Sequence, residues 1–168
     1  MDAKFFLQGQ TPDQFIAAAG DNRPRFEAQL AESAREVAAR GAAAGLPPNL
    51  NLLVIAEPWS GDVLYYLPPI LALAREAGWE VRIFHRDEHP ELIEPYRKEG
   101  LYRSIPVVVF YDASFTELSA WIERPAKATS VIDEEMLKLR RRLREEHRVE
   151  WRDETLREIS ELVRAKAH

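Results

Sequence analysis

An uninterrupted apolar stretch near the middle of the chain, residues 52–55 (LLVI), constrains the fold more than any other feature. Its side chains do not alternate between apolar and polar, which is typical of a strand that helices cover on both faces. The chain then passes through Glu57, Trp59 and Ser60 into residues 61–77, whose apolar positions recur at helical spacing. The pattern predicts a central strand leading to the N-terminus of a helix, where binding and catalytic groups are commonly found.

The segments around this unit predict a mixed α/β protein. Helices are expected to begin at Thr11 and at Asp21. A second strand over residues 79–84 follows the central helix, so the two strands are expected to be parallel neighbours in one sheet. Pro68 and Pro69 are expected to kink the helix of residues 61–77 or to end its first segment.

The second half of the chain predicts a further helix, a hairpin and a long helical end. A helix is expected over residues 89–100, and strands over residues 106–111 and 115–122 flank a short polar turn, which indicates an antiparallel hairpin. The chain beyond is helical in pattern, with two apolar stripes that differ in phase. The stripes consist of Ile132, Met136, Leu139 and Leu143, and of Val149, Leu156, Ile159 and Val163. The phase slips within residues 147–153, which predicts a bend or two helices.

Composition excludes several kinds of site. The chain of 168 residues contains no cysteine, which rules out disulfides, thiolate catalysis and thiolate metal sites. Its net charge is −5, and glutamates flank the basic run of residues 138–144 (KLRRRLR) at helical spacing, so we expect no nucleic-acid partner. Because no stretch resembles a signal peptide or a membrane span, we expect no membrane partner and a cytoplasmic location.

Two segments at the joints between the expected elements carry a resemblance to a known family. Residues 54–62 (VIAEPWSGD) resemble the thioredoxin strand that is followed by W-C-x-x-C, and residues 104–106 (SIP) resemble the segment in which thioredoxins have a cis-proline. Four segments are also similar to a bacterial thioredoxin-like branch of mostly uncharacterised proteins, whose members usually carry W-C-G-D. These segments are residues 57–62, 86–88, 103–106 and 121–125.

The resemblance implies a thioredoxin-like α/β fold, in which helices flank a central mixed β-sheet. The thioredoxin-like core is expected over residues 49–125, with an N-terminal helical extension (residues 1–48) packed on it and a C-terminal helical extension (residues 126–168). A chain of this length is expected to form one globular domain overall. The resemblance also implies that the Ile105–Pro106 peptide bond is cis.

The chain departs from the family at its two catalytic positions. Ser60 stands where the family has its nucleophilic cysteine, and Val63 stands where the resolving cysteine would be. A serine hydroxyl does not ionise usefully at neutral pH and forms no mixed disulfide, so we expect no thiol–disulfide exchange. The motif is therefore a degenerate one.

Three functions remain open. A groove at this corner is expected to bind an extended peptide or protein segment, because in the family the backbone before the cis-proline pairs with such ligands. Alternatively, the groove holds a small thiol such as glutathione, with Ser60 orienting it in a transferase or reductase. A third alternative is an oligomeric scaffold in which the C-terminal helix pairs between chains. No cofactor is expected, and the groove residues would be Trp59, Ser60, Gly61, Asp62, Ile105 and Pro106.

The acidic and hydroxyl groups of the corner also have purely structural interpretations. Ser60 suits the N-cap of the following helix, and Asp62 suits its first turn, where the helix dipole favours an acid. Glu57 lies at the end of the buried strand, where partial burial is expected to raise the pKa of its carboxyl group. A raised pKa is typical of a proton-transfer group. Without a thiol to serve, a structural hydrogen bond or a pair with an arginine is the favoured role of Glu57.

Residues 85–89 (HRDEH) suggest a metal site, because His85, Asp87 and His89 can converge on an ion if the backbone is extended. However, Pro90 begins a helix directly afterwards, so Asp87 is better explained as part of the region that caps it. We therefore expect no metal site.

Overall fold

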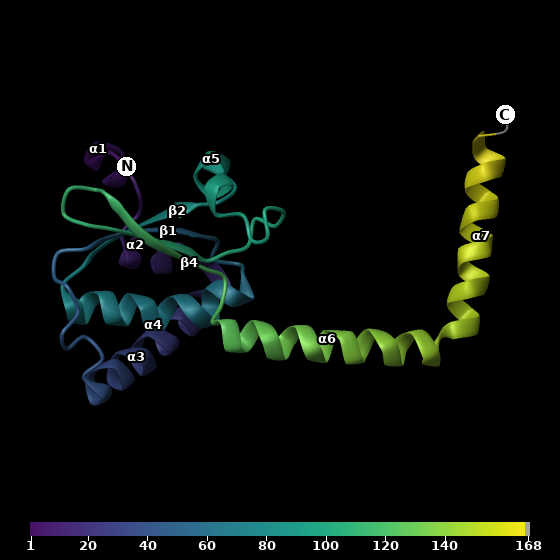
Figure 1. The fold of residues 1–168 in the computed structure, drawn as a ribbon, viewed down its shortest axis with the longest axis horizontal. Helices are drawn as coiled ribbons and strands as arrows, with labels where there is room; N and C mark the ends of the chain where they lie inside the picture. The colour runs from purple at the N-terminus through teal and green to yellow at the C-terminus, as the bar shows by residue number, and fades with distance from the viewer. Residues whose placement is uncertain (167–168) are drawn as a thin grey trace. The chain divides into compact units, whose positions relative to one another are not determined.

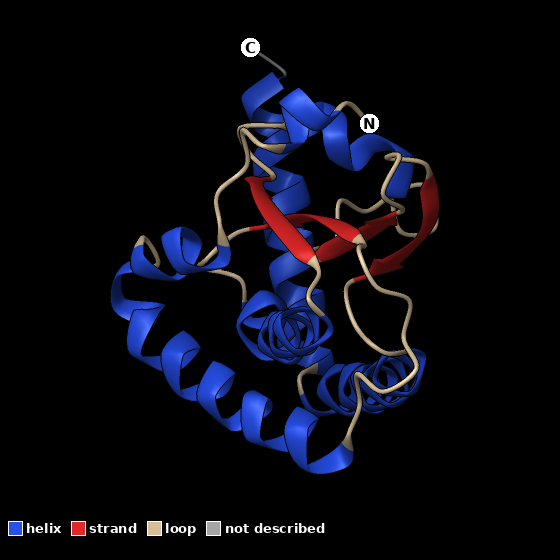
Figure 2. Ribbon diagram, turned by 90° about the vertical axis from the view of Figure 1, so that its left-hand side faces the viewer, coloured by secondary structure: helices blue, strands red, loops and turns tan. Residues whose placement is uncertain are grey.

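The computed structural model describes the backbone of residues 1–166 and the side chains of residues 1–159. Within this part of the chain, one 4-stranded mixed sheet has the order β2-β1-β3-β4 (Figure 2, red). The strands are β1 (Asn51–Ala56), β2 (Glu80–His85), β3 (Val107–Tyr111) and β4 (Glu117–Ile122). β1 is parallel to β2 and antiparallel to β3, and β3 and β4 form an antiparallel hairpin. The mixed α/β fold and the pairing of its strands are thus confirmed.

The helices begin and end where local chemistry satisfies their backbone groups. The helices of the described residues are α1 (Ala3–Phe6), α2 (Pro12–Ala17), α3 (Arg23–Arg40), α4 (Gly61–Ala77), α5 (Pro90–Ile93), α6 (Ala126–Glu146) and α7 (Arg148–Lys166), with short 3₁₀ turns at Gly20–Asn22 and Glu94–Tyr96. Thr11 and Gln14 form a reciprocal capping box at the start of α2. Gly78 ends α4 at a φ of 70°, a left-handed conformation that glycine adopts without strain.

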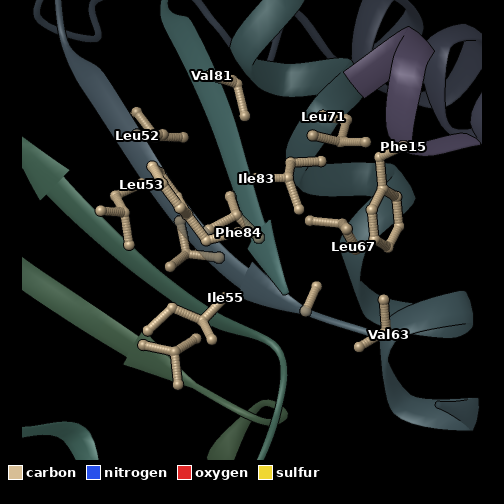
Figure 3. Packing of buried hydrophobic residues seen from close by; sticks show 14 of the residues in the cluster. Phe15, Leu52, Leu53, Ile55, Val63, Leu67, Leu71, Val81, Ile83 and Phe84 are labelled. Carbon is tan, nitrogen blue, oxygen red and sulfur yellow. The ribbon is translucent and has the colours of Figure 1, made fainter. Parts of the chain in front are cut away.

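The core lies on both faces of the sheet. α2, α3 and α4 cover one face, and α1 and α5 cover the other (Figure 1). Ile83 of β2 faces α4, near Leu67 of that helix and Phe15 of α2 (Figure 3). Its neighbour Phe84 faces the opposite side, where its ring stacks on Phe5 with 5.2 Å between the ring centroids. The N-terminal helices therefore supply part of the buried core.

Two local expectations need correction. α4 continues through Pro68 and Pro69, so of the two expected alternatives the end of a helical segment there is wrong. The leucines on either side of the prolines, Leu67 and Leu71, are buried in the core and hold the helix in place. The helix expected over residues 89–100 is much shorter, since α5 ends at Ile93. Pro95 has no N–H to donate to the carbonyl of Glu91, which explains the stop.

The N-terminal end also differs from the expectation. α1 was not expected, and α3 begins at Arg23 after a 3₁₀ turn instead of beginning at Asp21. α1 has only Phe5, Phe6 and Leu7 as its apolar run, too short for a periodic signal. Burial of Phe6 in the core stabilises it.

The chain divides into two compact units, residues 1–124 and residues 125–168. The second unit contains α6 and α7, and His147 stands between the two helices, which confirms the interruption predicted there. No residue of α6 or α7 whose side chain is described, up to residue 159, is buried. The side chain of Val163, placed on the second stripe, lies outside the described residues.

No helix in the described part of the chain has both the length and the apolar composition that crossing a membrane requires.

Candidate functional site

The register of the sheet brings the expected site residues to one edge. Ala56, the last residue of β1, pairs with His85 at the end of β2. Ile55 pairs with Val107 at the start of β3, and Val107 pairs with Ile122 at the end of β4. The corner after β1, the loop after β2, the Ile105–Pro106 segment and the loop after β4 therefore lie along the same edge of the sheet.

Ser60 is the N-cap of α4. Its Oγ accepts a hydrogen bond from the N–H of Val63 at 3.4 Å, and its own N–H donates to the carbonyl of Glu57 at 3.1 Å. The structural interpretation of Ser60 is thus observed directly. Among the described residues, the N–H groups of Gly61 and Asp62 have no hydrogen-bond partner, so the helix tip keeps two donors directed out of the helix.

Trp59 forms an exposed aromatic wall beside this tip. Trp59 is 60% exposed, and the guanidinium of Arg86 lies 5.1 Å from the centroid of its ring. Asn22 fixes the corner from the opposite side, because its Nδ2 donates to the carbonyl of Pro58 at 3.0 Å. The contact between Arg86 and Trp59 is a cation–π interaction, and it holds Arg86 against the corner.

A hollow of about 180 Å³ opens on the α3 side of Trp59. It is lined by Asn22, Arg25, Gln29, Trp59, Gly61, Leu64 and Tyr65. Its polar residues Asn22, Arg25 and Gln29 come from the 3₁₀ turn before α3 and from α3 itself, and they were not predicted. They recur at helical spacing, but no local pattern indicates that this segment lies beside Trp59.

The Ile105–Pro106 segment presents backbone groups at the same edge. The peptide bond is cis, the isomer expected from the sequence. The carbonyl of Pro106 accepts a hydrogen bond from the N–H of Glu123 at 2.7 Å. Ile105 itself is buried, yet no described residue forms a hydrogen bond with its N–H or its C=O. Backbone N–H and C=O groups without a protein partner are able to pair with water or with a ligand.

Glu57 has a structural partner set. It is only 5% exposed, its Oε1 accepts the N–H of Asp87 at 2.9 Å, and its Oε2 lies 3.2 Å from Nδ1 of His85. Glu57 therefore holds the loop after β2 against the corner after β1. Its partners are a backbone amide and a histidine rather than the arginine that we considered.

The residues of the HRDEH segment do not converge. His85 contacts Glu57, Asp87 pairs with Arg86 at 2.8 Å, and His89 lies 3.2 Å from Glu91. Across the described residues, no group of three histidine, aspartate or glutamate side chains is arranged to hold a metal ion.

A charged cluster, formed by Asp62, Lys98, Glu123 and Arg124, closes the β4 end of this edge. Arg124 lies 3.5 Å from Asp62 and also pairs with Glu123, which in turn pairs with Lys98. Burial raises the pKa of Asp62, although Arg124 opposes the effect. Burial alone would raise the pKa of Glu123 too, but hydrogen bonds from Arg124 and Lys98 hold that pKa below its ordinary value.

The cluster predicts a specific loss of stability in acid. Because the pKa of Glu123 in the folded chain is below its ordinary 4.5, the ionised carboxylate stabilises the fold above that pH. This contribution disappears as the pH falls through the folded value. We expect Glu123→Gln to lower the free energy of unfolding at neutral pH by about 1–2 kcal/mol. Urea unfolding at several pH values should show less further loss in acid for the variant than for the parent protein.

Glu32→Gln is the matched control for this prediction. Glu32 is an exposed residue of α3 for which no ion pair is seen among the described residues. The Glu32→Gln substitution should leave both the free energy of unfolding and its dependence on acid unchanged. Equal acid dependence in the parent and Glu123→Gln proteins would show that the cluster does not lower the pKa of Glu123.

Comparison with known proteins agrees with the fold. The family described as thioredoxin matches residues 9–138. A solved structure of a protein of unknown function from Pseudomonas aeruginosa is similar, with a TM-score of 0.60, 19% identity, and coverage of 74% of this chain and 78% of that chain. An HIV epitope scaffold is similar with a TM-score of 0.61 and 19% identity, over 78% of this chain and 80% of its own. At these identities the two structures show the fold alone. No curated protein sequence matches the chain.

Proposed function

This chain belongs to the thioredoxin family, and from that membership and its lack of cysteine we propose that it binds extended peptide or protein segments without catalysing thiol–disulfide exchange. The two halves of this proposal rest on different evidence. No thiol is present to attack or resolve a disulfide, so the chemistry of exchange is absent from the chain. The binding half rests on the edge of the sheet described above.

One observation carries the binding half of the proposal. The N–H and C=O of Ile105 have no partner among the described residues, although Ile105 is buried and lies at the edge where α4 begins. An extended segment that runs antiparallel to Ile105 can accept from its N–H and donate to its C=O, in the manner of one rung of an antiparallel ladder. Trp59 is placed to cover the ligand's side chains, because an exposed aromatic ring is a frequent anchor for peptides.

Selection of linear peptides from a phage-displayed library on the full chain tests this proposal. For the best synthetic peptide, NMR titration should shift the amide resonances of Ile105 and Gly61. Trp59→Ala should weaken binding by about 30-fold, as loss of an aromatic anchor worth about 2 kcal/mol does. Leu118→Ala is the control, because Leu118 of β4 is 55% exposed and lies outside the groove residues.

Two results would contradict the proposal. One is a library that yields no linear peptide above the background of uncoated wells. The other is a set of peptides that bind without shifting Ile105, which would place the binding surface elsewhere. Equal weakening by Trp59→Ala and Leu118→Ala would also remove the role assigned to the corner.

The small-thiol alternative stays a prediction. The Oγ of Ser60 accepts the N–H of Val63 as the α4 cap, and no further observation assigns it to a bound thiolate. The cytoplasmic location stays a prediction of the same kind.

A further inference from the structure

A second surface, independent of the groove, lies on α6. Ile132, Met136, Leu139 and Leu143 follow one another at alternating steps of four and three residues, which places them on one face of the helix. None of the four is buried, and Met136 is 41% exposed. An apolar helix face of this kind normally packs against another surface.

Charged residues border this apolar face in a particular order. Asp133 and Arg140 lie along one flank, and Glu135 and Arg142 lie along the other. On both flanks the acid is nearer the start of α6 and the base is nearer its end. Among the described residues, no ion pair involves Asp133 or Arg140, whereas Glu135 pairs with Lys138 at 3.0 Å within the helix.

This order makes α6 complementary to an antiparallel copy of itself. In an antiparallel pair the same flanks face each other, so Asp133 meets Arg140 of the other helix and Glu135 meets Arg142. Each contact occurs twice by symmetry, and all four flanking charges are matched. A parallel pair would match only Glu135 with Arg140, and it would place Asp133 opposite the uncharged Ala128. Charge complementarity therefore favours the antiparallel arrangement.

We propose that the chain self-associates through α6, which pairs antiparallel with α6 of a second copy. Met136 packs against Leu139 of the second copy, and Ile132 packs against Leu143. The contact is isologous, since the same face is used by both copies, and it closes as a dimer. The interface is short, so we expect association that is weak and dependent on concentration.

Sedimentation velocity on the full chain tests the proposal, at concentrations from about 10 μM to 1 mM because short interfaces bind weakly. A dimer should form as the concentration rises. Asp133→Arg alone and Arg140→Asp alone should each weaken the dimer, because each sets like charges opposite one another. An equimolar mixture of the two variants should dimerise at least as well as the parent protein, because every facing pair is then of opposite sign. Glu134→Arg and Arg141→Asp, which change charge on the opposite face of α6, are the matched controls.

The absence of native cysteine allows a second test of the register. Oxidation of a mixture of Met136→Cys and Leu139→Cys chains should trap the mixed dimer preferentially, because these positions face each other in the antiparallel pair. Preferential Met136→Cys homodimers would instead indicate a parallel pair. Arg141→Cys controls for random collisions.

The proposal fails if the protein is a monomer at every concentration. It also fails if Asp133→Arg alone, Arg140→Asp alone and their equimolar mixture all dimerise as strongly as the parent protein. Far-UV circular dichroism on each variant shows whether α6 is still helical, so a loss of helix is not mistaken for a loss of contact. Trp59→Ala should not change the association, since Trp59 is not one of the α6 residues that form the proposed contact.

Discussion

A Ser60→Cys variant is expected to carry a reactive thiol whose pKa lies below the value of about 8.5 that is usual for free cysteine. The new sulfur would sit at the N-cap of α4, next to the unpaired N–H groups of Gly61 and Asp62. These donors and the helix dipole stabilise the thiolate relative to the thiol. We expect a pKa lower by about one to two units, so that alkylation by iodoacetamide at neutral pH is roughly tenfold faster than for an unperturbed thiol.

The pH dependence of the alkylation rate measures this pKa directly. The variant thiol is the only one in the chain, so the reaction reports on one site. Tyr65→Cys is the matched control, because Tyr65 belongs to the same helix and is exposed but lies beyond its first turn. If both thiols titrate at the same pH, the helix tip does not favour an anion and the assignment of the corner is wrong.

A Phe15→Ala variant is expected to lose more stability than any other substitution considered for this chain. Phe15 is fully buried in α2, and its ring contacts Phe26 of α3 and His85 of β2, each at a centroid distance of 5.8 Å. Truncation removes these contacts and leaves a cavity between the N-terminal helices and the sheet. The free energy of unfolding should fall by about 3–5 kcal/mol, measured by urea denaturation.

Leu7→Ala provides the control for this prediction. Leu7 is also apolar and N-terminal, but it is 59% exposed, so its truncation should change stability by less than about 0.5 kcal/mol. A cost below about 1 kcal/mol for Phe15→Ala would mean that the N-terminal helices do not share the core of the sheet. That result would contradict the expectation that residues 1–48 pack on the core.

Much of the fold follows from patterns that are local in the sequence. The apolar run before Glu57 predicts a buried strand, the periodicity after Ser60 predicts α4, and the polar turn near Asp112 predicts the hairpin. The resemblance to thioredoxin rests on residues at these joints, and the family match confirms it. The capping role of Ser60 was also predictable, because a cap is a contact between near neighbours.

The errors arise where a local rule competes with packing or with a second local rule. The rule that proline ends helices failed at Pro68 and Pro69, because buried leucines on both sides of the prolines keep α4 continuous. The helix expected over residues 89–100 disregarded the same rule at Pro95, and there the rule holds, since α5 ends at Ile93. A single sequence does not show which of these two situations applies.

The amino-acid order alone settles that this protein has a thioredoxin-type corner and no thiol chemistry, because both depend on which residue occupies a position. The surroundings of that corner depend on tertiary structure. Asn22 meets the Pro58 carbonyl and Lys98 meets Glu123 only because the tertiary structure brings distant segments to one edge of the sheet. Such contacts join residues far apart in the chain, and the free energy that selects them comes from burial of the whole core.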